Sequence, residues 1–230
     1  MLVVGTINIG MTVDLKEIDN FLTADEVTFV RDRVLNTIPA DPNYSLVAGP
    51  DVPMVHSANY HIFNPADNNY QDVMAILMPK FQEHFHPELF IQQIHILDSI
   101  DPYRVHSDVE SGYLQSSTPT THAWTFIIPL EDYNSHTIVF NEGSKTKDLG
   151  EYTKTTQPYG YATVDDETYR KYFTHIPRDL LQWLTIDQIF KWKKGAMFAA
   201  PRFRFHTSDN FLANGLTRKQ AIVAWTSIPI

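Results

Sequence analysis

The sequence contains no cysteine. Without thiols the chain can form neither a disulfide bond nor a thiolate metal site, so a bound metal ion must be held by histidine, aspartate or glutamate. This absence fits a reducing compartment, and we expect a cytoplasmic protein. Long apolar runs are missing as well, since no stretch approaches the roughly 18 apolar residues that a membrane helix needs. Residues 1–13 are apolar but lack the basic flank of a signal peptide, so they predict an early strand. We expect the protein to have no membrane partner.

Positive charge is scarce in this chain. It has 18 Lys and Arg against 27 Asp and Glu, which gives a formal net charge of −9 with histidine neutral. A surface of this sign repels a phosphate backbone, so we expect no broad nucleic-acid binding. The same surface favours a basic peptide or protein as a partner.

The rest of the composition is that of a soluble globular chain. Hydrophobic residues make up 43%, charged residues 20% and aromatic residues 13% of the sequence. A chain of 230 residues can bury one sizeable core, and the aromatic content is typical of large side chains packed between sheets. We therefore predict a single domain over residues 1–230.

Helical signals are strongest before residue 91. Thr23 is followed three residues later by Glu26, which is a capping box and predicts a helix over 23–37. Apolar residues at helical spacing predict a second helix over 69–85 and a third over 178–191.

Strand signals dominate from residue 91 onward. Runs of β-branched and aromatic residues between turn residues predict strands at 91–100, 103–108, 122–130, 135–141, 195–206 and 218–228. We divide the domain into an N-terminal part of strands and helices, 1–90, and a core, 91–230, with an insertion over 142–191. This order predicts a mostly β fold with flanking helices. The core would be a double-stranded β-helix (jelly roll), with the N-terminal helices packed on one sheet.

The segment YRVHSDV contains a pair of residues suited to metal binding. Side chains alternate along a strand, so His106 and Asp108 would face the same side. His206 follows a glycine turn and an apolar strand, and as a third ligand it would complete a facial triad on iron. A His-x-Asp pair alone is common in a chain with 10 His and 27 acidic residues. Arg218 adds specificity, because a guanidinium at the start of the last predicted strand can bind one end of a dicarboxylate.

The remaining aromatic and histidine side chains are interpreted as structural. Trp124 and Trp225 are interpreted as core aromatics. The histidines without a partner at metal-ligand spacing are His56, His61, His95, His122, His136 and His175.

Five segments, taken in order, resemble the 2-oxoglutarate/Fe(II)-dependent dioxygenase superfamily, and within it the prolyl-4-hydroxylase-like branch. They are IDNFLTADEV, DPYRVHSD, HAWTFIIPLED, KKGAMFAAPRFRFH and RKQAIVAW. The resemblance covers about residues 18–228, and its specificity comes from the order and spacing of short motifs.

The resemblance implies a function and a set of site residues. His106, Asp108 and His206 would be the ligands of Fe(II). Arg218 would hold the far carboxylate of the cosubstrate 2-oxoglutarate, and Tyr103 and Thr125 would be hydrogen-bonding candidates for it. The implied reaction uses dioxygen to hydroxylate a substrate and releases succinate and CO2, with ascorbate in support. Peptides, proteins and small molecules are all implied substrates, and peptidyl proline comes first.

Two other classes of protein remain open on the residues alone. A cupin-like module would keep the barrel and the histidines, and would bind a metal or small ligand without catalysis. A purely structural jelly roll would need no metal. Binding of 2-oxoglutarate separates the first class from the oxygenase, and the metal content of the purified protein separates the second.

Overall fold

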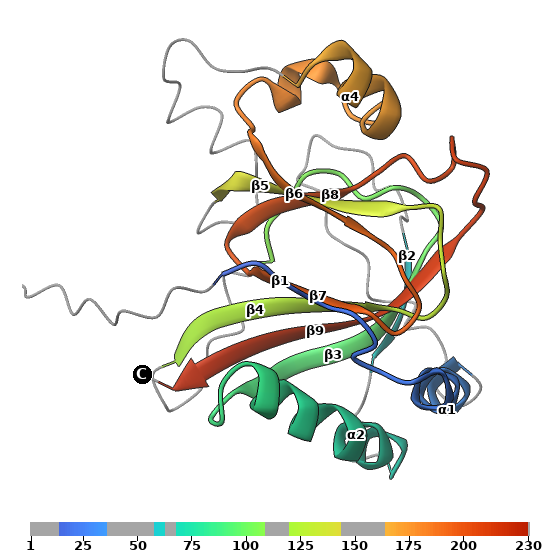
Figure 1. The fold of residues 1–230 in the computed structure, drawn as a ribbon, viewed down its shortest axis with the longest axis vertical. Helices are drawn as coiled ribbons and strands as arrows, with labels where there is room; N and C mark the ends of the chain where they lie inside the picture. Colours follow the sequence, from blue (N-terminus) through green and yellow to red (C-terminus); the bar gives the residue numbers. More distant parts are fainter. Residues whose placement is uncertain (1–13, 36–57, 63–67, 109–119, 144–163, 230) are drawn as a thin grey trace, which may run out of the picture.

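Two antiparallel sheets that face each other form the centre of the molecule (Figure 1). The computed structural model describes residues 14–35, 58–62, 68–108, 120–143 and 164–229. The larger sheet has the order β1 (Lys16–Ile18), β7 (Met197–Pro201), β4 (Thr120–Pro129), β9 (Lys219–Pro229), β3 (Phe90–Ser99) and β2 (Ala58–Ile62). The smaller sheet has the order β6 (Ile186–Lys191), β5 (His136–Gly143) and β8 (Arg204–Ser208). The predicted mostly β fold is thereby confirmed, while the strand predicted within 1–13 and residues 144–163 of the insertion lie outside the described ranges.

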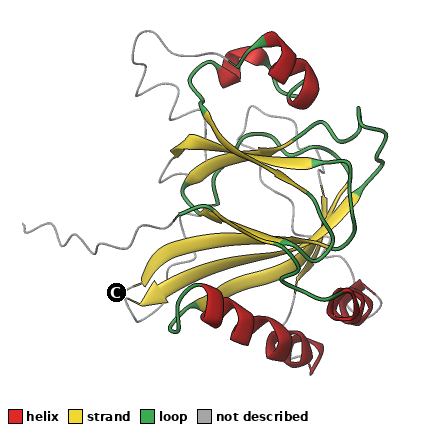
Figure 2. Ribbon diagram, viewed as in Figure 1, coloured by secondary structure: helices red, strands yellow, loops and turns green. Residues whose placement is uncertain are grey.

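The two predicted N-terminal helices are present, and Figure 2 shows them outside the strand layers. Helix α1 (Ala24–Leu35) begins at the predicted capping box: the Glu26 amide donates to Thr23 Oγ1 over 3.2 Å, and the Thr23 amide donates to the Glu26 carboxylate over 2.8 Å. Helix α2 (Asn68–His84) contains Pro79. Within the described ranges, no helix is both long and apolar enough to cross a membrane.

The helix predicted over 178–191 is wrong. Its first part is a short 3-10 turn, Arg178–Leu181, and its last part is the strand β6, which pairs with β5. The helix of this region, α4 (Asp166–Tyr172), lies earlier, where the Asp165 carboxylate accepts a hydrogen bond from the Thr168 amide over 2.8 Å. The segment interpreted as an insertion therefore contributes an edge strand to the smaller sheet.

Buried side chains form separate apolar layers on the two faces of the larger sheet. On one face, residues of α1 and α2 join residues of the sheet in a single cluster, in which the rings of Phe81 and Phe126 stack with centroids 4.5 Å apart. On the other face, Val223 and Trp225 of β9 belong to a cluster between the sheets. Helix α4 covers the outer face of the smaller sheet (Figure 1). Strand β9 is therefore covered on both faces.

Candidate metal centre and its cavity

The backbones of His106 and His206 are hydrogen-bonded to each other. The His106 amide donates to the His206 carbonyl over 3.0 Å, and the His206 amide donates to the His106 carbonyl over 2.9 Å. This antiparallel bridge is isolated, so the strand predicted over 103–108 is reduced to one pairing at His106. His206 lies in β8, opposite Val139 of β5. The pairing brings the two imidazole rings to a centroid separation of 4.3 Å.

Asp108 completes a three-residue cluster with these histidines. Its Oδ1 lies 3.7 Å from His106 Nε2, and its Oδ2 lies 3.4 Å from His206 Nε2. One ligand atom from each of the three residues lies within 4.8 Å of the others. Ligands bound at about 2.1 Å on one face of an octahedral ion are about 3 Å apart, so the cluster would contract on binding a metal. The structure thus brings together the three residues predicted as ligands.

The ring orientation of each histidine is fixed by a carbonyl two residues before it. His106 Nδ1 lies 2.7 Å from the Arg104 carbonyl oxygen, and His206 Nδ1 lies 3.2 Å from the Arg204 carbonyl oxygen. A carbonyl oxygen can only accept, so each Nδ1 carries the proton and donates it. Both Nε2 atoms therefore keep a lone pair on the side of Asp108, as a metal ligand requires.

The Asp108 carboxylate is buried but stays ionised. Burial by itself raises the pKa of this carboxyl group. Two histidines, a hydroxyl and a guanidinium act against burial, and together they hold the pKa below its ordinary value; they belong to His206, His106, Thr125 and Arg202. Thr125 Oγ1 donates to Oδ2 over 2.5 Å. Arg202 Nε and Nη2 donate to the Asp108 carbonyl oxygen over 3.3 and 2.9 Å.

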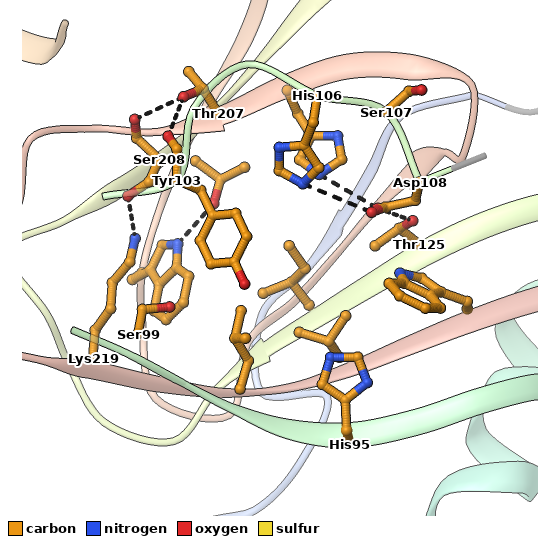
Figure 3. A pocket seen from close by; sticks show the side chains of 17 residues that line it. His95, Ser99, Tyr103, His106, Ser107, Asp108, Thr125, Thr207, Ser208 and Lys219 are labelled. Carbon is orange, nitrogen blue, oxygen red and sulfur yellow. Dashed lines mark hydrogen bonds and ion pairs between the residues drawn. The ribbon is translucent and has the colours of Figure 1, made fainter. Parts of the chain in front are cut away.

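A cavity between the two sheets has this cluster in its wall (Figure 3). Besides the three candidate ligands, the polar side chains in the wall are those of His95, Ser99, Tyr103, Ser107, Thr125, Thr137, Thr207, Ser208 and Lys219. Figure 3 shows Lys219 and Ser99 on the side of the cavity opposite Asp108 and Thr125. The cavity thus has a candidate metal end and a cationic end.

Lys219 is the buried cation of the cavity, with 2% of its surface exposed. Its Nζ donates to Ser135 Oγ and Ser208 Oγ, each over 2.8 Å, and lies 3.9 Å from the centre of the Trp192 ring. Burial lowers the pKa of this amine to about 7, although the nearby Asp209 carboxylate acts in the opposite direction. A bound anion would restore the charged form, so this end of the cavity favours a carboxylate.

Arg218, the predicted cosubstrate anchor, lies outside the wall of the cavity. Its Nε and Nη2 donate to the two carboxylate oxygens of Asp98 over 3.0 and 2.5 Å, and 56% of its side chain is exposed. Lys219, the next residue, pairs with Ser99 across β9 and β3, and both line the cavity. The basic residue available to a ligand in the cavity is therefore Lys219.

Tyr103 and Thr125, the other predicted cosubstrate residues, both line the cavity. The Thr125 hydroxyl bonds the Asp108 carboxylate, so it contacts a candidate metal ligand. The Tyr103 ring lies 5.3 Å from the His106 ring, and its carbonyl oxygen accepts a hydrogen bond from Thr207 Oγ1 over 2.7 Å.

Two residues interpreted as structural lie in the cavity wall. Trp225 and His95 line the cavity, with ring centroids 5.4 Å apart, whereas Trp124 belongs to the cluster under the helices. His56 and the side chain of His122 lie outside the described residues. Sequence reasoning missed both cavity residues because neither stands at metal-ligand spacing.

Two buried polar atoms of the cavity wall have no hydrogen-bond partner among the described residues. They are Ser99 Oγ and Trp225 Nε1. Buried polar groups are nearly always paired, so such atoms mark places where a ligand or water completes the structure. No feature of the sequence distinguishes them from other serines and tryptophans.

Comparisons with known proteins establish the fold of the chain. No protein-family model matches the sequence, and no curated protein matches it at a significant level. Among solved structures, the chain is similar to the non-heme alpha ketoglutarate dependent epimerase SnoN from nogalamycin biosynthesis, with a TM-score of 0.55 and 13% identity over 94% of this chain and 76% of that one. It is also similar to the carbocyclase SnoK of the same biosynthesis, with a TM-score of 0.54 and 16% identity over 93% and 79% of the two chains.

A third similar structure is an oxidoreductase of the 2OG-Fe(II) oxygenase family from Burkholderia pseudomallei. Its TM-score is 0.52 and its identity 11%, over 93% of this chain and 84% of that one. Identities this low establish the fold alone. The chain has the jelly-roll fold of 2-oxoglutarate/Fe(II) oxygenase structures, and the predicted resemblance to that superfamily is confirmed at the level of the fold.

Proposed function

We propose that this protein is an Fe(II)- and 2-oxoglutarate-dependent dioxygenase. One observation carries the proposal: two histidines and an aspartate present ligand atoms within 4.8 Å of one another in the wall of a buried cavity. When bound, iron and 2-oxoglutarate would supply the oxidising chemistry, in which dioxygen hydroxylates a substrate C–H bond with succinate and CO2 as co-products. The residues of the chain bind, orient and shield these groups.

The donor set of the cluster fits ferrous iron. Two imidazole nitrogens and one carboxylate oxygen are typical ligands of non-haem Fe(II), and they leave positions open for other groups. His106 and His206 each use Nδ1 on a backbone carbonyl, which leaves Nε2 for the metal. Thr125 bonds the Asp108 carboxylate and Arg202 bonds the Asp108 backbone, so the third ligand is held from two sides.

Lys219 replaces Arg218 in this proposal as the residue that holds the far carboxylate of 2-oxoglutarate. An ammonium has three donors, and two of them bond Ser135 and Ser208, which leaves one for a ligand. Ser99 Oγ, on the neighbouring strand, supplies a second group without a partner in the described part of the chain. The low dielectric of this buried end strengthens the attraction between ammonium and carboxylate.

Production of succinate tests the proposal directly. The protein is incubated with Fe(II), ascorbate and labelled 2-oxoglutarate, and labelled succinate is measured. We expect slow turnover by the wild type without added substrate and none by Asp108→Ala or His206→Ala. His84→Ala, which removes an exposed histidine at the end of α2, should match the wild type.

Two outcomes would contradict the proposal. A protein that binds metal but not 2-oxoglutarate would support the cupin-like binding module. A protein that binds neither would support a structural jelly roll. For substrate screening, prolyl peptides with basic flanks come first, because the sequence motifs and the net charge of −9 favour them.

A further inference from the structure

The indole N–H of Trp225 is the starting observation. Two tryptophans line the cavity. Trp192 Nε1 donates to Thr137 Oγ1 over 2.9 Å. Trp225 is 8% exposed, and its Nε1 is buried without a hydrogen-bond partner among the described residues. A buried donor is seldom left unpaired, so this N–H calls for an acceptor that the described part of the chain does not supply.

Strand pairing puts Trp225 beside the candidate metal centre. Trp225 of β9 lies opposite Thr125 of β4, and cross-strand neighbours have Cβ atoms about 5 Å apart. The Thr125 hydroxyl in turn donates to the Asp108 carboxylate. Lys219 and Ser99 lie at the other end of the cavity (Figure 3). The unpaired indole N–H therefore belongs to the metal end.

The chemistry of this end selects the acceptor. An indole N–H only donates, so its partner is an oxygen or another lone pair. The adjacent His95 is completely buried, and burial lowers its pKa to about 4, so it is neutral and adds no positive charge. Asp108 adds a negative charge nearby, which disfavours a free anion. An anionic oxygen is stable here when it is bound to the metal at the same time, as in a chelating 2-oxo acid.

We infer that Trp225 Nε1 donates a hydrogen bond to the metal-chelating 2-oxo-carboxylate end of 2-oxoglutarate, with His95 packed against the indole. This inference rests on the proposed function. It divides recognition of the cosubstrate between the two ends of the cavity: Lys219 of β9 and Ser99 of β3 hold the far carboxylate, and Trp225, further along β9, holds the chelating group. Trp225 is thus a binding and positioning residue of the candidate site.

Anaerobic titration of the Fe(II)-loaded protein with 2-oxoglutarate tests this inference. Binding is followed by the charge-transfer absorption band that a chelated 2-oxo acid gives with Fe(II). Trp225→Phe removes the N–H, and we expect it to weaken binding at least about tenfold, as for the loss of a hydrogen bond to a charged group. We also expect the band to shift, because its chelating oxygen loses a donor. The matched control is Trp124→Phe, in the cluster under the helices and outside the cavity wall. It removes an indole N–H that already donates to the Asp14 carbonyl oxygen, and it should leave both the affinity and the band unchanged.

A second ligand assigns the effect to one end of the cosubstrate. The probe 2-oxobutanoate keeps the chelating group and lacks the far carboxylate. Trp225→Phe should reduce the affinities for both ligands by the same factor. Lys219→Met should reduce the affinity for 2-oxoglutarate far more than that for 2-oxobutanoate. An effect of Trp225→Phe on 2-oxoglutarate alone would overturn the inference.

The outcomes separate this inference from the proposed function. If the wild type does not bind 2-oxoglutarate, the proposed function fails. If the wild type binds it and Trp225→Phe binds it equally well with the same band, only the inference fails. Should Trp225→Phe not fold, site-specific replacement of Trp225 by benzothienylalanine keeps the ring shape, exchanges N–H for sulfur and gives the same test.

Discussion

Each imidazole of the candidate metal centre is oriented by its own stretch of backbone. The carbonyl of Arg104 holds His106, and the carbonyl of Arg204 holds His206, so the same i−2 contact occurs twice. No other side chain is needed to select the tautomer of either ring. The carboxylate of Asp108 differs, because its orientation depends on the Thr125 hydroxyl.

This difference makes Thr125 a testable position. Thr125→Val keeps the shape of the side chain and removes the hydroxyl that bonds Asp108. We expect the affinity for Mn(II) to fall by about 10-fold, the lower end of the range for outer-shell partners. Titration followed by the electron paramagnetic resonance of free Mn(II) measures this. Thr137→Val removes a cavity hydroxyl that bonds Trp192 and should leave the metal affinity unchanged. Equal affinities in the wild type and Thr125→Val would contradict the prediction.

Lys219 and Arg218 give a second prediction at the scale of residues. Lys219→Met should reduce the affinity for 2-oxoglutarate by about 100-fold, because the far carboxylate would then be buried without a cation. Arg218→Leu should leave this affinity nearly unchanged. It should instead lower the free energy of unfolding by about 1–2 kcal/mol, because it leaves the buried Asp98 carboxylate without its partner. Calorimetric titration and urea denaturation measure the two effects, and the opposite pattern would restore Arg218 as the anchor.

The pKa of Lys219 predicts how cosubstrate binding depends on pH. Burial lowers this pKa to about 7, so the ammonium loses its proton as the pH rises through that value. The affinity for 2-oxoglutarate should therefore be higher at about pH 6 than at about pH 8.5, and Lys219→Met should flatten the profile. The effect on stability has the opposite sign. Between the folded pKa and about 10.4 the unfolded chain binds the additional proton, so the contribution of Lys219 to stability increases with pH. A flat affinity profile in the wild type would contradict the assignment.

The sequence predicted the three candidate ligands but not which basic residue faces the cavity. Ile222 and Ala224 of β9 belong to the cluster under the helices, while Val223 and Trp225 belong to the cluster between the sheets. Both faces of this strand are apolar, so the sequence shows no alternation of polar and apolar residues. It therefore does not show which alternate side chains of the strand face the cavity. Arg218 and Lys219 are adjacent, and which of them can contact a ligand depends only on which side chains of the strand face the cavity.

At the scale of elements, the sequence predicted those elements that depend on local hydrogen bonds. It did not predict those that depend on pairing with a distant strand. The capping box at Thr23 and Glu26 placed the start of α1, because its hydrogen bonds lie within one turn. The error over 178–191 has the opposite origin. Ile189 and Phe190 of β6 contact different apolar clusters, so consecutive residues are apolar as in a buried helix. Only the pairing of β6 with β5 shows that the segment is a strand.

Helix α2 supports the sheet through Phe81, which yields a prediction about stability. Phe81 is completely buried, and its ring stacks on Phe126 of β4 and on Phe21. Phe81→Ala should lower the free energy of unfolding by about 3–5 kcal/mol, because it removes a large ring from a packed cluster. Phe29→Ala in α1, where 37% of the residue is exposed, should cost less than about 1 kcal/mol. Chemical denaturation measures both, and similar losses would contradict the packing.

At the scale of the whole molecule, metal binding should stabilise the fold. A ligand that binds only the folded state adds about 2.7 kcal/mol when its free concentration is 100 times its Kd. Mn(II) at that level should raise the Tm of the wild type by about 5–10 °C in thermal denaturation. His206→Ala should show no such increase. A rise in both proteins would mean that the ion binds elsewhere.

The backbone bridge between His106 and His206 has a consequence for a chain that lacks cysteine. It joins positions about 100 residues apart, and a cross-link across a loop of that length removes several kcal/mol of chain entropy from the unfolded state. A metal ion held by both residues would make such a cross-link in a chain that has no cysteine with which to form a disulfide. Unlike a disulfide, this cross-link would form when metal binds and be lost when metal dissociates. The lifetime of the folded chain would therefore depend on the concentration of available iron.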